Sequence, residues 1–151
     1  MPVVWRIVKK KHENDALTGE GARRFGGRWN SPGQRVIYTA ETLSGALLEI
    51  LVHSSRRLLS YYSVYRLEIP EPITSDVPVS ECPANWRSSP PPPELAQIGD
   101  HWCIEQRSAV LRVPNAIVPM ETNYLVNPTH VDFPLIQIEG PLDYVVDARL
   151  V

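Results

Sequence analysis

Proline is the residue that most restricts how this chain can fold. Fifteen of the 151 residues are proline, and eight of them lie between Pro70 and Pro93. Because proline inside a helix removes a backbone hydrogen bond and clashes with the preceding turn, long uninterrupted helices are not expected. Hydrophobic residues still make up 43% of the chain, which is enough for a buried core. We expect one compact domain over residues 1–151, with a proline-rich surface excursion at about 70–93.

The hydrophobic pattern predicts short strands. Segments rich in β-branched and aromatic residues favour strands, and a turn at Asn127 and Pro128 precedes the last of them. The expected strands are residues 3–8 (VVWRIV), 35–40 (RVIYTA), 61–69, 108–113, 135–139 and 144–151, with a possible fragment at 117–118.

Two segments predict helices. Residues 43–53 (LSGALLEILVH) are apolar almost all the way round a helical wheel, which is typical of a buried helix, and Thr42 can cap its start. Residues 94–106 predict one helix, or two short ones divided at Gly99. Since strands and helices do not alternate strictly, the expected fold class is α+β.

The charged residues divide the chain into two unlike halves. Residues 1–66 carry eleven basic and five acidic side chains, whereas residues 67–151 carry four basic and twelve acidic ones, for a net charge of −2. This split predicts an anionic ligand for the first half and a cationic partner for the second. The acidic second half argues against an extended nucleic-acid surface.

Cysteine and histidine usage excludes several classes of site. Cys82 and Cys103 stand 21 residues apart without a CxxC motif, and the four histidines show no metal-binding spacing. Neither a disulfide framework nor a metal site is therefore expected. The N-terminal segment lacks the apolar core of a signal peptide, and no stretch is long enough to span a membrane. The prediction is a soluble, cytoplasmic protein.

Residues 21–30 (GARRFGGRWN) combine glycine with arginine, a pattern that suits a phosphate or nucleotide. Glycine leaves backbone amides accessible, and the arginines offer guanidinium forks for a pyrophosphate. The segment is neither a dinucleotide-fold GxGxxG nor a Walker loop. The alternative is a solvated basic loop with Trp29 in the core.

Arg28, Tyr38 and Glu49 are spaced so that a loop, a strand and a helix could bring them into one cleft. Arginine can clamp an anion, tyrosine offers an aromatic face with a hydroxyl, and glutamate can stabilise a developing sugar cation. Each has a simpler alternative. Tyr38 could be a core residue, and Glu49 could be a surface residue paired with Arg56 or Arg57.

The basic residues could instead bind nucleic acid, with Trp5, Tyr61 and Tyr62 as stacking platforms. No Gly-x-Ser-x-Gly elbow or cysteine–histidine signature supports a hydrolase triad. The alternative function is nucleic-acid binding or RNA cleavage, and a third possibility is an interaction module without catalytic activity.

Four blocks of the sequence resemble the RES-domain toxins of bacterial Xre/RES toxin–antitoxin pairs. They are WR at residues 5–6, GARRFGGRWNSPGQRVIYTAETLSGALLEILVH at 21–53, GDHWCIEQRSAVLRVP at 99–114 and NYLVNPTHVDF at 123–133. The arginine, glutamate and serine that name the family correspond to Arg28, Glu49 and Ser108, with Tyr38 as a further active-site member. One departure is Asn115, where many relatives carry a serine.

The resemblance implies an α+β fold similar to the ADP-ribosyltransferase toxins and an enzyme that takes NAD as its substrate, with no further cofactor. Family members break the bond between nicotinamide and ribose, and pass the ADP-ribosyl group to water, phosphate or a protein. The resemblance also implies a cognate Xre-type helix-turn-helix antitoxin that covers the active site.

The chemistry of the residues suggests roles that are consistent with this resemblance. Glu49 would stabilise the ribose cation, and Tyr38 would stack on or orient the nicotinamide end. Arg28 would fix a phosphate or ribose.

Four further residues are expected in supporting roles. Arg6 or Arg24 would help Arg28 to bind the substrate, and Ser108 would hydrogen-bond the ribose or nicotinamide rather than act as a nucleophile, since no base partner is evident. Asn127 is a candidate pocket residue, although a turn before the following proline also explains it.

Overall fold

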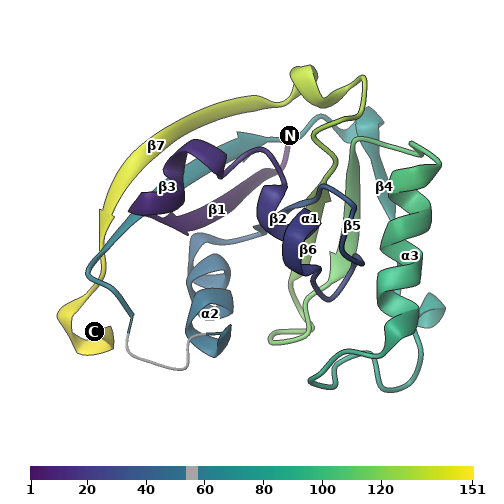
Figure 1. Ribbon diagram of the computed structural model, residues 1–151, viewed down its shortest axis with the longest axis horizontal. Helices are drawn as coiled ribbons and strands as arrows, with labels where there is room; N and C mark the ends of the chain where they lie inside the picture. The colour runs from purple at the N-terminus through teal and green to yellow at the C-terminus, as the bar shows by residue number, and fades with distance from the viewer. Residues whose placement is uncertain (54–57) are drawn as a thin grey trace.

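The computed structural model describes residues 1–53 and 58–151, and a seven-stranded sheet in the order β4-β5-β6-β2-β1-β3-β7 forms its body (Figure 1). Neighbouring strands are antiparallel, except that β4 runs parallel to β5. The strands are β1 (Val3–Lys9), β2 (Ile37–Ala40), β3 (Tyr61–Glu68), β4 (Thr74–Asp76), β5 (Val110–Pro114), β6 (Thr122–Val126) and β7 (Gln137–Val145).

In the described part of the chain, three α-helices accompany the sheet: α1 (Glu20–Phe25), α2 (Leu43–His53) and α3 (Pro93–Ile104). Figure 1 shows α2 and α3 on the same side of the sheet, with a space between them. The mixture of an antiparallel sheet with separate helices confirms the α+β class. Within residues 1–53 and 58–151, no helix has both the length and the apolar character needed to cross a membrane.

The strand alternation divides the core between the two faces of the sheet. On β6, Leu125 packs in a cluster with Trp102 of α3, whereas Tyr124 and Val126 pack in a different cluster with β1 and β3 residues. Because side chains alternate along a strand, Asn123 points to the same face of the sheet as Leu125. This is the face covered by α2 and α3, and it is called the helical face below. A third cluster lies between α2 and strands β1 and β3.

Helix α2 begins as the sequence predicts but is less buried than expected. The Thr42 hydroxyl accepts a hydrogen bond from the Gly45 amide at 2.9 Å, which confirms the N-terminal cap. Among the α2 residues only Gly45 and Ala46 are buried, while Leu51 and Val52 are 40% and 56% exposed. The prediction of a buried helix is therefore wrong, because only one side of α2 packs against the sheet.

The proline-rich stretch 70–93 is part of the domain core. It contributes strand β4, and it buries Ile73, Val77 and Trp86. Its last residue, Pro93, opens α3, where the missing amide of proline costs no helical hydrogen bond. The expectation of a surface excursion describes its exposed prolines but not these buried anchors.

The structure also differs from the sequence prediction in elements whose hydrophobic pattern is weak. Strand β6 lies at the centre of the sheet, yet no strand was expected over 122–126, and α1 also was not expected. Residues 117–118 belong to a loop instead of a strand. In place of the two C-terminal strands expected at 135–139 and 144–151 there is one strand, β7, which ends at Val145, and residues 148–150 form a short 3-10 helix.

Candidate active site

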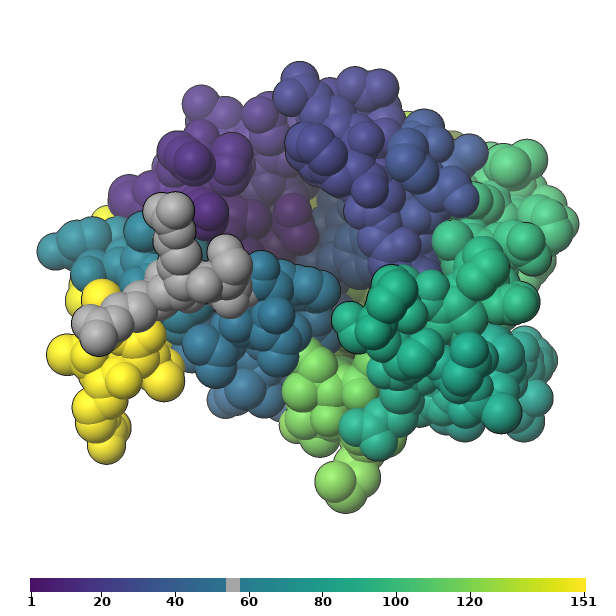
Figure 2. Space-filling view, turned by 60° about the horizontal axis from the view of Figure 1, so that its bottom comes forward, coloured from purple at the N-terminus to yellow at the C-terminus, as the bar shows by residue number. Residues whose placement is uncertain are grey.

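The candidate active site lies between α2 and α3 on the helical face of the sheet. Figure 2 shows this face hollowed at its centre, between the segment containing α1, helix α2 and the green segment that includes the start of α3. Arg28 reaches this region from the loop after α1, Tyr38 from β2 and Glu49 from α2. Tyr38 pairs with Leu125 of β6, two residues from Asn123, and the Asn123 side chain donates a hydrogen bond to Glu49. The charges of Glu49 and Tyr38 also act on the Arg28 guanidinium.

Backbone carbonyls hold the Arg28 side chain. Its Nη1 donates to the carbonyl oxygens of Trp86 at 2.9 Å and Ser88 at 3.0 Å. Burial lowers the pKa of Arg28, while the Glu49 charge acts in the opposite direction. Since neutral carbonyls orient the guanidinium without cancelling its charge, the side chain keeps its capacity to bind an anion. The proline-rich stretch supplies both carbonyls, so it is not separate from the candidate chemistry.

The Tyr38 hydroxyl connects β2 to the loop after α1 that carries Arg28. It accepts a hydrogen bond from the Trp29 amide at 3.1 Å and donates to Asn30 Oδ1 at 2.6 Å. Asn30 is 1% exposed, and its amide nitrogen in turn donates to three backbone carbonyls of the same region. Burial raises the pKa of Tyr38 well above its usual range, so the phenol stays protonated and is not suited to act as a base.

Glycine permits two close approaches around this loop. A Cβ on Gly27 would lie 2.6 Å from the Tyr38 hydroxyl, and a Cβ on Gly99 would lie 1.6 Å from the Trp29 carbonyl oxygen. Next to this contact, Asp100 Oδ1 accepts a hydrogen bond from the backbone amide of residue 31 at 2.8 Å. Helix α3 thus fixes the position of the loop that carries Arg28. It runs unbroken through Gly99, so one helix is present and not two short ones.

Glu49 lies at the α2 side of the site and is 32% exposed. Its Oε1 accepts a hydrogen bond from Asn123 Nδ2 at 3.2 Å, and its Oε2 lies 3.6 Å from His53 Nε2. Asn115 Nδ2 donates to Asn123 Oδ1 at 3.2 Å, which extends the contact into the loop after β5. The alternative partners Arg56 and Arg57 lie outside the described residues.

Asn123 and Asn115 are site residues that sequence reasoning did not select. Both fall within or beside the blocks that resemble the RES-domain toxins, but no strand was expected at 122–126. A period-two pattern that aligned Asn123 with Leu125 on the helical face would have been the available signal.

Ser108 is not brought to this group of residues. Its hydroxyl is buried, accepts a hydrogen bond from Trp102 Nε1 at 2.9 Å and donates to the Val110 carbonyl at 2.7 Å. It precedes β5, whereas the Glu49 partner Asn123 pairs with Val113 near the other end of that strand. Five residues of extended chain correspond to about 16 Å. Its role in binding substrate stays a prediction.

Arg6 contacts backbone on two elements. Its Nε donates to the Ala16 carbonyl at 2.5 Å and its Nη1 to the Tyr38 carbonyl at 3.0 Å. Burial lowers the pKa of Arg6 to about 10. These bonds connect β1 to the turn at Ala16 and to β2. Because Arg6 alternates with Trp5 and Ile7, which pack toward α2, its side chain lies on the other face of the sheet, and its role in substrate binding stays a prediction.

Arg24 belongs to a cluster of charges on α1. Hydrogen bonds from Arg23 and Arg24 lower the pKa of Glu20 to about 2. Arg35 lies 3.1 Å from the same carboxylate. This pairing partly compensates the basic excess of the glycine-rich segment, so Arg28 is the arginine of that segment held at the candidate site.

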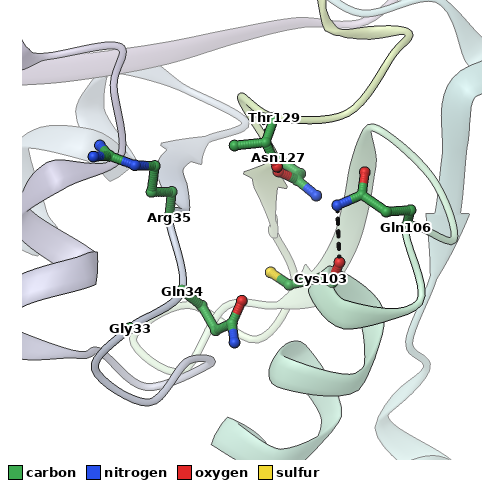
Figure 3. Close-up of a pocket in the computed structure, with 7 residues that line it drawn as sticks. All are labelled: Gly33, Gln34, Arg35, Cys103, Gln106, Asn127 and Thr129. Atoms are coloured by element: carbon green, nitrogen blue, oxygen red, sulfur yellow. Dashed lines mark hydrogen bonds between the residues drawn. The ribbon is translucent and has the colours of Figure 1, made fainter.

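Asn127 lines a separate cavity of about 260 Å³ at the other end of β6 (Figure 3). Its Oδ1 accepts hydrogen bonds from the Thr129 amide at 3.0 Å and the Thr129 hydroxyl at 2.7 Å, as expected for a turn. Its Nδ2 is buried and has no partner among the residues that the structure describes. The other lining residues are Gly33, Gln34, Arg35, Cys103 and Gln106, and the Arg35 guanidinium points away from the cavity in Figure 3.

Comparison with known proteins gives a consistent result. The family model described as "RES domain" matches residues 3–147. A protein named "Toxin Res" from Yersinia enterocolitica is 37% identical over 98% of this chain and 99% of its own length. A protein from a Sphingobium species named "Prs ADP-ribosylating toxin" is 35% identical over 97% of this chain and 95% of its own.

A solved structure shares the fold. The crystal structure of the MbcT–MbcA toxin–antitoxin complex of Mycobacterium tuberculosis aligns with a TM-score of 0.68 at 20% identity, over 95% of this chain and 84% of the matched chain. The M. tuberculosis protein named "NAD(+) phosphorylase MbcT" is 54% identical over a 37-residue segment, which is 24% of this chain and 20% of its own.

Proposed function

The chain belongs to the RES domain family, and we propose that it is a toxin enzyme that breaks the bond between nicotinamide and ribose in NAD. One observation carries the proposal: a guanidinium oriented by carbonyls, an aromatic side chain and a carboxylate come from the loop after α1, from β2 and from α2 on the same face of the sheet. The names of two relatives, an ADP-ribosylating toxin and an NAD(+) phosphorylase, support the same reaction class.

The reaction needs little proton transfer on the leaving side. The bond between the nicotinamide nitrogen and the ribose carbon breaks, and its electron pair stays on that nitrogen, so nicotinamide departs as a neutral molecule. The ribose becomes cationic in the transition state, and a carboxylate beside it lowers the barrier. Glu49 is the carboxylate that the site provides.

The other side chains bind and orient the dinucleotide. Arg28 would hold a phosphate or ribose oxygen, because carbonyls fix it while its charge remains. Tyr38 would offer its ring, since its hydroxyl is already engaged by Trp29 and Asn30. Water, phosphate or a protein nucleophile then bonds to the ribose carbon and loses its proton.

The test is nicotinamide release from NAD by purified, antitoxin-free protein, with and without phosphate. We expect Glu49→Gln to lower kcat by about 100-fold or more and Arg28→Lys chiefly to raise KM. Glu139→Gln, at an exposed position of the edge strand β7, is the matched control and should behave as the wild type. Absence of release in both buffers would refute the proposal, and a dependence on phosphate would identify phosphorolysis.

A cognate antitoxin is part of the proposal. Relatives are named toxins, and the structural neighbour was solved as a toxin–antitoxin complex. The partner we propose is an Xre-type helix-turn-helix protein encoded beside this chain. Expression of the two together should restore growth and give a complex that survives purification; failure to bind would contradict this.

The structure offers no specific support for the nucleic-acid alternative. Arg23, Arg24 and Arg35 gather around Glu20, which reduces the positive charge available to a phosphate backbone. RNA binding with a steep dependence on salt would favour that alternative, and a flat response would remove it.

A further inference from the structure

Asn115 is a buried residue whose side-chain orientation the backbone dictates. It is 1% exposed, and its Oδ1 accepts hydrogen bonds from the Ile117 amide at 2.8 Å and the Val118 amide at 2.9 Å. Since only the carboxamide oxygen can accept from two N–H donors, the NH₂ group must point the other way. The Asn115 amide therefore has one possible direction in the fold.

The orientation of the Asn115 amide determines the orientation of the Asn123 amide. Asn115 Nδ2 donates to Asn123 Oδ1 at 3.2 Å, so the Asn123 amide must turn its own NH₂ group toward Glu49 Oε1, also at 3.2 Å. The backbone of Asn123 is rigid, because β6 pairs with Ala40 of β2 on one side and with Val113 of β5 on the other. The chain of donors runs from backbone amides to the carboxylate without a rotatable hydroxyl.

We propose that Asn115 is a positioning residue, which through Asn123 fixes the direction of the hydrogen bond that Glu49 receives. The inference rests on the proposed function, in which an ionised Glu49 acts on the ribose. A donor aimed at Oε1 favours the ionised carboxylate and restrains its rotation. The other oxygen, Oε2, stays on the side of His53.

Other charged groups around Glu49 come from several elements. His53 lies on the same helix, and Arg28 acts on it from the loop after α1. Glu121, in the loop before β6, accepts a hydrogen bond from the Thr42 hydroxyl at the start of α2. The amide chain is neutral, so a neutral substitution such as Asn123→Leu removes the donor to Glu49 without changing these charges.

The decisive variant is Asn115→Asp, which keeps the shape of the side chain. One carboxylate oxygen can still accept from the Ile117 and Val118 amides, so the loop is retained. The second oxygen is an acceptor that faces Asn123, whose NH₂ group must then turn toward residue 115. This rotation presents Asn123 Oδ1 to the Glu49 carboxylate and replaces an attraction with a repulsion.

In Asn115→Asp we expect kcat/KM for nicotinamide release to fall by about 10- to 100-fold, which corresponds to the loss of one hydrogen bond to a charged group. Because the ionised form of Glu49 loses its donor, the acidic limb of the pH profile should move to higher pH. Asn14→Asp, on an exposed residue, controls for the change in net charge, and Asn123→Leu reports the loss of the donor without a new charge near Glu49. Thermal unfolding of each protein reports the fold independently of activity.

A second variant covers the case in which Asn115→Asp does not fold. Asn123→Leu removes the donor without adding an acceptor, and it should move the acidic limb in the same direction by a smaller amount. A folded Asn115→Asp with wild-type activity and an unchanged pH profile would overturn the inference, as would a uniform loss of activity with no movement of the profile. An inactive wild type would instead refute the proposed function.

Discussion

Ser108→Ala separates a structural hydroxyl from a catalytic one. The Trp102 indole is fully buried, and its Nε1 donates to the Ser108 hydroxyl at 2.9 Å. Alanine leaves this N–H without a partner in the core, because nothing else replaces the lost oxygen in the unchanged fold. An unsatisfied buried donor costs about 1–3 kcal/mol. At about 2–4 °C for each kcal/mol in a domain of this size, the Tm should fall by about 2–12 °C.

The assay combines thermal unfolding with nicotinamide release below the transition. We expect the folded Ser108→Ala protein to retain kcat, since its hydroxyl bonds only to Trp102 and Val110 among the described residues. Trp102→Phe removes the indole N–H, so Ser108→Ala should cost less stability in that background than in the wild type.

An opposite pattern would refute this reasoning. An unchanged Tm together with a large loss of kcat would make Ser108 a catalytic residue, as the resemblance to the RES-domain toxins leads one to expect. Additive effects of the two substitutions would show that the hydrogen bond contributes nothing to stability.

Three further predictions follow from other contacts. Gly99→Ala places a Cβ 1.6 Å from the Trp29 carbonyl, so the loop and α3 must separate and stability should fall by about 3 kcal/mol or more; a Tm close to that of the wild type would contradict the close packing. The pKa of Glu20 is lowered from 4.5 to about 2, so its stabilising effect is complete above pH 4.5 and is lost as the pH falls through about 2; the Tm difference between wild type and Glu20→Gln should vanish there. Burial raises the pKa of Cys103 to about 12, so mass spectrometry should find its thiol unmodified by iodoacetamide until the protein unfolds.

The sequence predicts those elements whose pattern is local. β1, β2, β3 and α2 lie where periodicity and the Thr42 cap place them, because each buries one face or carries its own terminating signal. β6 was missed, since a short strand with polar residues at its start has little pattern until β2 and β5 pair with it. Its position at the centre of the sheet is a property of the tertiary structure.

The candidate site shows the same division. Arg28, Tyr38 and Glu49 were predicted to converge, because the loop, strand and helix that carry them follow one another in the chain. Asn123 and the carbonyl groups that hold Arg28 could not be selected, because they come from segments distant in sequence. A carbonyl group in particular has no signature, since every residue carries one.

The anchoring of Arg28 has an evolutionary consequence. The two acceptors belong to the main chain at positions 86 and 88, so substitutions there leave the contact intact as long as the path of the chain is kept. Selection on this contact therefore acts on the course of the backbone, and on the Trp86 side chain through its burial in the core. Insertions or deletions between residues 83 and 90 should be rarer among active relatives than substitutions, and an alignment scored by identity alone would undervalue this segment.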